Sequence, residues 1–253
     1  MTMPLIVGNW KMNLLSAEAA ELALGIKEFV EKITDVRVIL APSFTSLHSV
    51  KDALSGSKIG LASQNFYYEK DGAYTGEISP DMLKDVGCKF AIVGHSERRQ
   101  LFGETDELVN KKILAALEND IIAILCIGET REQRKAGETH KIIASQVNKA
   151  LDGLDDRQLK DVIVAYEPVW AIGTGENATV GQVAEIHGLI RKIISEKYQG
   201  NENKPLSILY GGSVTPQNSR ELLQNDEIDG ALVGGASLNI DSFCDIIRSA
   251  QLK

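Results

Sequence analysis

The chain has 253 residues, of which 43% are hydrophobic and 25% charged, and its formal net charge is −8. These values are typical of a globular protein that buries its own core, and the acidic balance argues against a nucleic-acid partner. Apolar runs are too short to span a membrane and no signal-peptide pattern opens the chain. Three cysteines without a Cys-x-x-Cys spacing indicate neither a disulfide framework nor a zinc site, so we expect a cytoplasmic protein with reduced thiols.

Short apolar runs alternate with helical patterns along the whole chain. The runs lack in-and-out alternation, which is typical of strands buried on both faces of a parallel sheet. Helix starts are marked at Ser79 and Thr215, where each cap residue precedes a proline. The predicted strands cover residues 5–7, 36–40, 59–62, 90–93, 121–127, 162–165, 206–209 and 228–233.

Eight strand–helix units in about 250 residues predict an α/β fold, a closed (β/α)8 barrel. The main alternative is a doubly wound open sheet, which usually opens with a Gly-x-Gly-x-x-Gly turn. No such turn follows the first predicted strand. Because no linker, repeat or low-complexity segment divides the chain, we expect a single domain over residues 1–253.

Polar residues and glycines follow the predicted strands in chain order. Because the carboxyl ends of barrel strands meet at one mouth, an ammonium (Lys11), an imidazole (His95) and a carboxylate (Glu167) should converge there. The residues at these strand ends are Asn9, Lys11, Gln64, His95, Cys126, Glu167, Ser213, Gly234 and Gly235.

Glu167 is the most informative of these residues. It leaves the apolar run 162–165 and is followed at once by Pro168 and then by a loop that contains glycine. A carboxylate that a closing loop can desolvate is suited to be a general base. The alternative is a solvated glutamate at a strand end, with Pro168 doing no more than ending the strand.

Two glycine pairs, Gly211-Gly212 and Gly234-Gly235, end the seventh and eighth predicted strands. Glycine lets the backbone approach an anion closely, and successive N–H groups form an anion-binding nest. A helix starting after Ala236 would add its dipole. Either pair alone is also compatible with an ordinary tight turn, but two pairs on adjacent strands favour a bound phosphate.

Other polar residues near the mouth have simpler interpretations beside the functional ones. Lys11 directly follows an apolar strand and Trp10, so we expect it to be partly buried and to need an anion. Cys126 is interpreted as a small buried filler. The charged run 97–99 is either a solvated surface or, as we expect, a structural ion network. We interpret Glu104 and Glu129 as structural residues and Trp170 as the anchor of a lid hinge.

The connection over residues 64–79 is long and carries Phe66, Tyr67, Tyr68 and Tyr74 without a helical period. Structureless loops of this length are uncommon unless they are functional. Its aromatic content indicates contact with another surface, and the alternative is a loop that packs on itself.

Over its full length the chain resembles the triosephosphate isomerase family. Each matching stretch is moderately specific, and their shared order and spacing are very specific. The stretches are GNWKMN (8–13), QN (64–65), GHSERR (94–99), AYEPVWAIGTG (165–175), YGGSV (210–214) and GGA (234–236). The resemblance implies a TIM barrel that interconverts dihydroxyacetone phosphate and glyceraldehyde 3-phosphate through an enediolate, with no metal and no organic cofactor.

The resemblance also implies roles for individual residues. Glu167 would move the carbon-bound proton, and His95 would polarise the carbonyl as a neutral imidazole, as is known of this family. Lys11 and Asn9 would bind the substrate, with Glu97 and Cys126 supporting the site from behind. Backbone N–H groups of Gly173, Ser213, Gly234 and Gly235 would hold the phosphate. The lid would comprise Pro168, Val169, Trp170, Ala171, Ile172, Gly173, Thr174 and Gly175.

The family is usually dimeric, so the resemblance implies a homodimer in which Tyr74, Thr75 and Gly76 enter the partner subunit. Two rival functions stay open on sequence alone. A Schiff-base aldolase-like barrel needs a lysine within a central strand, and none of the predicted strands contains one. A barrel kept only as a binding scaffold would tolerate loss of Lys11, His95 or Glu167, and all three are present.

Overall fold

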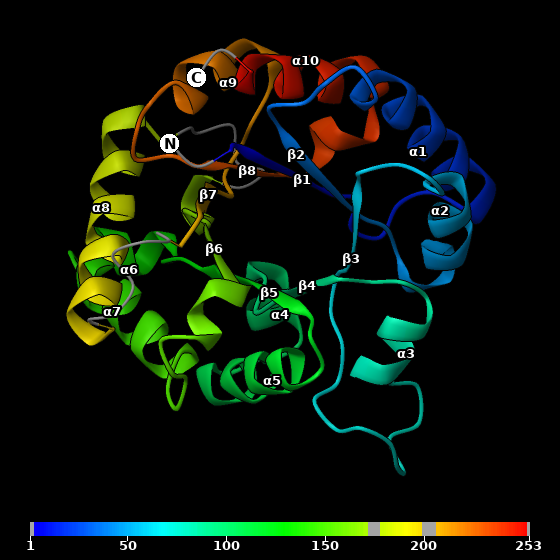
Figure 1. Cartoon of the computed structure of the whole chain (residues 1–253). Helices are drawn as coiled ribbons and strands as arrows, with labels where there is room; N and C mark the ends of the chain where they lie inside the picture. Colours follow the sequence, from blue (N-terminus) through cyan, green and yellow to red (C-terminus); the bar gives the residue numbers. More distant parts are fainter. Residues whose placement is uncertain (1–2, 172–177, 199–205, 252–253) are drawn as a thin grey trace.

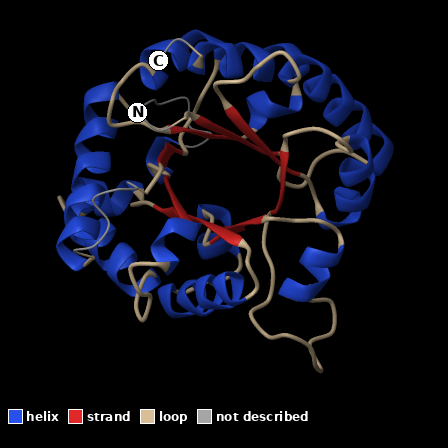
Figure 2. Ribbon diagram, viewed as in Figure 1, coloured by secondary structure: helices blue, strands red, loops and turns tan. Residues whose placement is uncertain are grey.

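The computed structural model describes residues 3–171, 178–198 and 206–251, and within them eight parallel strands close into a barrel surrounded by helices (Figure 1). Strands β1 (Leu5–Asn9) and β8 (Gly230–Val233) pair with each other and complete the ring. Figure 2 shows the strands as an inner ring and the helices as an outer one. The predicted single-domain TIM barrel is confirmed, and the alternative interpretation as an open, doubly wound sheet is wrong.

The strands form where the apolar runs predicted them, because each run is buried on both faces. β7 and β8 begin two residues later than expected, at residues 208 and 230 rather than 206 and 228, and β2, β3 and β5 each begin one residue later. The remaining strands are β2 (Arg37–Ala41), β3 (Gly60–Ser63), β4 (Phe90–Val93), β5 (Ile122–Ile127), β6 (Val162–Tyr166) and β7 (Ile208–Tyr210).

Cap residues set the starts of several helices. Ser79 accepts a hydrogen bond from the backbone N–H of Met82, and Thr179 forms a capping box with Gln182. The helices within the described residues are α1 (Ser16–Val30), α2 (Leu47–Ala53), α3 (Pro80–Asp85), α4 (Ser96–Leu101), α5 (Asp106–Glu118), α6 (Arg131–Lys135), α7 (Thr139–Ala150), α8 (Val180–Lys197), α9 (Pro216–Leu223) and α10 (Ile240–Ala250).

The helix expected after Ala236 does not follow the glycine pair immediately. The residues Gly235–Leu238 form a single 3-10 turn, and α10 begins only at Ile240, where Asn239 caps it. The glycine pair therefore leads into a short turn rather than into a full helix dipole.

Two apolar layers hold the barrel together. The inner layer fills the ring with alternate strand residues such as Val7, Ile92, Ile124 and Leu209, and the outer layer joins the other strand faces to the helices. Fully burying one such aliphatic side chain contributes about 1.5–3 kcal/mol, so the ring is rigid enough to fix what projects from its ends. Over the part of the chain that the structure describes, no helix combines the length and apolar character needed to cross a bilayer.

Candidate active site

A pocket of about 290 Å³ lies at the carboxyl ends of the strands. Residues from five strand ends line it, because each strand delivers the residues that directly follow it to the same mouth. The pocket also has the backbone of both glycine pairs in its wall. Its lining includes Asn9, Lys11, His95, Glu167, Gly211, Gly212, Ser213, Gly234 and Gly235.

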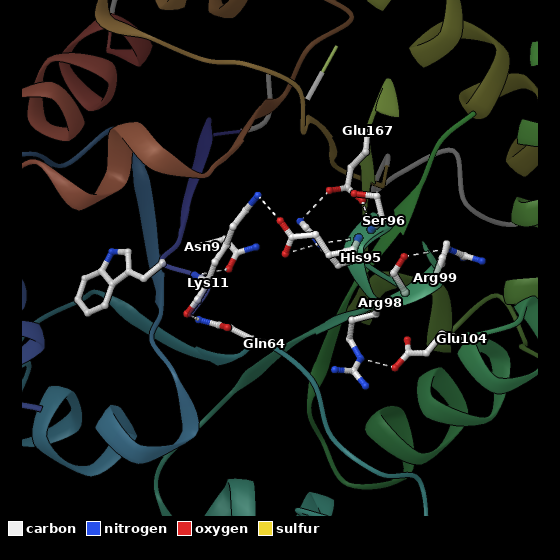
Figure 3. A network of polar contacts seen from close by, with 12 residues as sticks. Asn9, Lys11, Gln64, His95, Ser96, Arg98, Arg99, Glu104 and Glu167 are labelled. Atoms are coloured by element: carbon white, nitrogen blue, oxygen red, sulfur yellow. Dashed lines mark hydrogen bonds and ion pairs between the residues drawn. The ribbon is translucent and has the colours of Figure 1, made fainter. Parts of the chain in front are cut away.

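Glu167 directly follows β6 and only 1% of its surface is exposed. Its Oε2 accepts a hydrogen bond of 2.9 Å from the backbone N–H of Ser96, and its Oε1 lies 2.9 Å from Nε2 of His95 (Figure 3). The alternative of a solvated glutamate at a strand end is therefore wrong. The sequence did not indicate the Ser96 contact, because a backbone donor leaves no mark on residue type.

His95 is the residue that caps α4, and it is 6% exposed. Its Nδ1 accepts the backbone N–H of Glu97 at 3.3 Å, which requires that this nitrogen carry no proton. Burial lowers the pKa of His95, but the adjacent Glu167 carboxylate raises it and the net direction in this arrangement is upward. The helix N-terminus opposes that shift, since it disfavours imidazolium. The charge of His95 thus depends on where the Glu167 carboxylate lies.

Lys11 has a left-handed backbone, with φ of 52°. For a residue with a side chain this conformation costs roughly 1–2 kcal/mol. Its Nζ lies 2.6 Å from Oε1 of Glu97, and its backbone N–H donates to Oδ1 of Asn9 at 3.1 Å. The anion that a partly buried Lys11 was expected to need is Glu97 in this structure.

Glycines let the strand ends approach Glu167 closely. A Cβ on Gly211 would lie 2.8 Å from Cγ of Glu167, and one on Gly128 would lie 1.7 Å from the Glu167 carbonyl oxygen. A Cβ on Gly234 would lie 3.4 Å from Cε of Lys11, whereas Gly235 faces open space. Any larger residue at position 128 would displace the backbone that carries the carboxylate.

Glu129 is a fully buried carboxylate behind the loop that follows β6. It accepts hydrogen bonds from the Trp170 indole N–H at 2.9 Å, the Tyr166 hydroxyl at 3.1 Å and the Arg134 guanidinium at 3.2 Å. Burial and this carboxylate raise the pKa of Tyr166, which stays a neutral donor. Glu129 therefore anchors the 3-10 turn Val169–Ala171, in agreement with the structural roles predicted for Glu129 and Trp170.

Half of the predicted lid lies within this anchored part of the chain. Pro168 joins Glu167 to the turn, and Val169 donates its N–H to the Glu129 carbonyl at 3.1 Å. The predicted lid and phosphate-binding residues Ile172, Gly173, Thr174 and Gly175 lie outside the described residues.

The charged run after His95 forms a structural ion network, as expected. Arg98 donates to Glu104 at 2.5 Å, and the buried Lys112 also binds Glu104. Arg99 pairs with Asp106 at 2.6 Å. Lys112 was not identified from the sequence as part of this network. Its position on the same helix face as the buried Val109, Ile113 and Ala116 could have indicated a buried lysine.

Cys126 is fully buried at the end of β5. Burial, and then the Glu167 carboxylate, raise the pKa of its thiol well above the ordinary value. Its carbonyl accepts a hydrogen bond from Arg99 at 3.3 Å. The structure thus supports the interpretation of Cys126 as a neutral buried filler beside the site.

A second hollow of about 450 Å³ lies on the other side of Glu167, toward α5 and α7. Its cations are already engaged, since Arg99 pairs with Asp106 and Lys149 with Glu107. The smaller pocket at the mouth has both glycine pairs and Lys11, and it is the better candidate for an anionic ligand.

The family model described as triosephosphate isomerase matches residues 4–250 of the chain. The chain belongs to the triosephosphate isomerase family. It is 49% identical to the triosephosphate isomerase of Roseiflexus sp. over 98% of both chains, and 48% identical to that of Rhodopirellula baltica over 97% of both. It is 47% identical to the enzyme of Geotalea uraniireducens over 99% of this chain and 100% of that one.

Membership of the triosephosphate isomerase family fixes the reaction. The chain is an enzyme that interconverts dihydroxyacetone phosphate and glyceraldehyde 3-phosphate, a step of glycolysis. A triose phosphate is therefore its substrate, and neither the Schiff-base aldolase nor the scaffold barrel is its function.

Proposed function

We propose that isomerisation takes place in the pocket at the barrel mouth, with Glu167 as the base. Glu167 removes the proton from the carbon beside the carbonyl of the triose phosphate and returns it to the neighbouring carbon, so the enediolate forms and collapses without net proton loss. The observation that carries this proposal is the burial of Glu167, at 1% exposure, in contact with His95 at the wall of the pocket. The contacts with His95 and the Ser96 N–H hold this carboxylate at the wall of the pocket, within reach of a bound substrate.

His95 polarises the substrate carbonyl and moves protons between the two oxygens. Support comes from its Nδ1, which accepts the Glu97 N–H, so that Nε2 is the nitrogen that carries the proton. That nitrogen faces Glu167 and the pocket, where a substrate oxygen would accept its hydrogen bond. A neutral imidazole can donate at one step and be restored at the next.

Lys11 and Asn9 bind the substrate, and the Lys11 ammonium offsets the negative charge of the enediolate. In the present arrangement Glu97 neutralises that ammonium at 2.6 Å. The phosphate is held by backbone N–H groups of Ser213, Gly234 and Gly235, together with Gly173 of the predicted lid. Three of these residues line the mouth pocket, beside the Lys11 cation.

The segment from Pro168 to Gly175 acts as a lid that excludes water. The enediolate phosphate can eliminate phosphate when water reaches it, so closure protects the intermediate. The fixed turn Val169–Ala171, anchored on Glu129, supplies a rigid base at one end of such a lid.

The working enzyme is a cytoplasmic homodimer that needs no cofactor. Support for the dimer comes from the loop between β3 and α3, which projects from the barrel in Figure 1. Tyr74 in this loop is 41% exposed. The Tyr67 ring packs in a tilted arrangement against the rings of Tyr68 and Tyr74, with centroids 4.5 and 4.6 Å away. The loop is thus partly packed on itself, and in the proposal its tip, Tyr74 to Gly76, enters the partner subunit.

The proposal for Glu167 is tested with Glu167→Asp. The shorter side chain withdraws the carboxylate by roughly 1 Å, and a misplacement of that size costs about 10²-fold in turnover. Turnover of glyceraldehyde 3-phosphate is measured by coupling to a dehydrogenase that reduces dihydroxyacetone phosphate, with circular dichroism as the control for folding. A folded variant within about threefold of wild type would remove Glu167 as the base.

A further inference from the structure

We infer that Gln64 is a positioning residue that holds the strained backbone of Lys11 and thereby aims its ammonium into the pocket. The inference rests on the substrate-binding role proposed above for Lys11. Gln64 directly follows β3, on the same side of the barrel mouth as β1. Figure 3 shows its side-chain amide directed at the Lys11 backbone.

The first observation is the conformation of Lys11. Among the described residues only Lys11, Leu14 and Asp120 combine a positive φ with a side chain, and Lys11 is the one that lines the mouth pocket. A left-handed residue of this kind persists only where its surroundings over-determine it. Some contact must therefore hold the peptide unit after Lys11.

The second observation is the contact that does so. The Gln64 Nε2 donates one hydrogen bond of 2.8 Å to the Lys11 carbonyl and one of 2.9 Å to the Ala41 carbonyl at the end of β2. A primary amide has two N–H donors in a fixed geometry, and both are used. Because Ala41 also accepts the Trp10 N–H at 3.1 Å, the amide ties the Lys11 backbone to two rigid strands.

The two ends of Lys11 are fixed by other partners. Its N–H donates to Asn9, and its ammonium lies 2.6 Å from Glu97. When a substrate takes the place of Glu97, the ammonium loses that partner and its position depends on the backbone. Relaxation of Lys11 to a right-handed conformation would swing the side chain away from the bound anion, so loss of the Gln64 contact should weaken substrate binding more than folding.

The decisive variant is Gln64→Glu, which keeps the shape but places a carboxylate oxygen against two carbonyl oxygens. We expect KM for glyceraldehyde 3-phosphate to rise by about tenfold or more, with native circular dichroism. Desolvation and the facing carbonyls raise the pKa of the introduced carboxyl, and its protonated form donates one hydrogen bond. The kcat/KM relative to wild type should therefore recover as the pH falls from about 8 to about 6.

The matched control is Gln224→Glu, the same change at an exposed position at the end of α9, away from the mouth. Its relative kcat/KM should be unchanged and independent of pH. All variants are assayed at protein concentrations where their sedimenting mass equals that of the wild type. If Gln64→Glu does not fold, Gln64→Asn, one methylene too short to reach both carbonyls, is measured in the same way.

A double variant separates positioning from general support. If Gln64 acts through Lys11, adding Gln64→Glu to Lys11→Met should change kcat/KM by less than about twofold, because the positioned group is already gone. Effects that multiply, or a variant with a lower Tm but an unchanged KM and no pH-dependent recovery, would overturn the inference. Unchanged kinetics of Lys11→Met alone would instead refute the proposed role of Lys11, and the inference with it.

Discussion

Both oxygens of Glu167 are already engaged before a substrate arrives. The Ser96 N–H holds one at 2.9 Å and the His95 imidazole faces the other at 2.9 Å. A buried carboxylate needs such partners, because an unpaired charge in a dry site is costly. The base is thus stored in a desolvated, paired state, and it must exchange these contacts for the substrate carbon during the reaction.

The pairing with Glu167 sets the pKa of His95. Burial alone lowers that pKa, and the net upward direction comes from the Glu167 carboxylate. We therefore expect Glu167→Gln, which removes the charge but keeps the shape, to lower the pKa of His95. The imidazole signals followed by NMR over a pH titration test this, and a pKa that does not move would contradict the pairing.

The same shift makes stability depend on pH in a definite direction. A raised pKa in the folded state contributes stability that is fully present below the ordinary histidine value of 6.5 and is lost as the pH rises through the folded value. The stability difference between wild type and Glu167→Gln that is due to this pair should therefore shrink with rising pH above about 6.5. Urea midpoints measured across that range report it, and a difference that grows with pH would refute it.

At the residue scale the sequence predicts which side chains reach the site better than it predicts their contacts. Lys11, His95 and Glu167 each follow a buried strand, and that position alone brings them to the mouth. The left-handed turn at Lys11 and the two hydrogen bonds of Gln64 depend on the tertiary register of β1, β2 and β3. No local propensity marks such contacts, since glutamine is as common on exposed helices as at strand ends.

Among the secondary-structure elements, the ends of β5, β6 and β7 pack so closely that glycine is required between them. The Gly128 position has no space for a Cβ, because the Glu167 carbonyl would lie 1.7 Å from it. Gly128→Ala should therefore shift the backbone of Glu167 and reduce turnover by about 10²-fold or more. The coupled assay, with thermal unfolding in parallel, measures both effects.

Gly188→Ala is the control for that variant, because a Cβ at Gly188 in α8 meets nothing within 4 Å. Replacing glycine by alanine in a helix interior stabilises by about 0.8–1 kcal/mol, so this variant should unfold at a higher temperature with unchanged turnover. Equal turnover of the two variants would contradict the crowding at Gly128.

The helices α4 and α5 are joined by a buried ion cluster centred on Glu104. Burial raises the pKa of Glu104, but Arg98 and Lys112 outweigh it and the net direction is downward. Glu104→Gln leaves the largely buried Lys112 without its anion, and breaking a buried pair in this way costs about 3–5 kcal/mol. Urea unfolding at neutral pH measures the loss.

The pH dependence gives a second test of the same cluster. A lowered pKa contributes stability that is present above the ordinary glutamate value of 4.5 and is lost as the pH falls through the folded value. The unfolding midpoints of wild type and Glu104→Gln should therefore converge on acidification. Glu107→Gln, which affects an exposed pair with Lys149, is the control and should shift the midpoint little at any pH.

The elements themselves were readily predicted because their signals are local. Apolar runs of strand length and caps such as Ser79 depend on neighbouring residues only. The starts of β7 and β8 and the 3-10 turn Gly235–Leu238 were not, because pairing with neighbouring strands decides where a strand begins. Backbone pairing of this kind is set by residues far away in the chain.

At the scale of the whole molecule, several large apolar side chains remain on the surface. Met12, Leu15, Leu101 and Phe102 are between 66% and 95% exposed, and Tyr74 adds an exposed ring. Large exposed apolar side chains of this kind are candidates for the interface of the proposed dimer. We expect the chain of 27.6 kDa to sediment at twice that mass, and a native mass of one chain would refute the proposed dimer.

The loop tip offers a direct test of that assembly. Thr75→Arg adds a long cation at a tip that is proposed to enter the partner subunit, so the sedimenting mass should fall toward that of one chain. The matched control is Ser55→Arg, at an exposed position after α2. An unchanged dimer with Thr75→Arg would place the interface elsewhere.

Closure of the barrel between β8 and β1 has a consequence for biosynthesis. On the ribosome, β1 emerges before the other barrel strands, and β8, with which it pairs, emerges after all of them. Until β8 is made, the nascent sheet therefore keeps two unpaired edges, one at β1 and one at the last strand added, and exposed edges invite pairing with other chains. The barrel can close only after β8 has left the exit tunnel. A product truncated before β8 therefore keeps its unpaired edges and is prone to aggregation or chaperone capture.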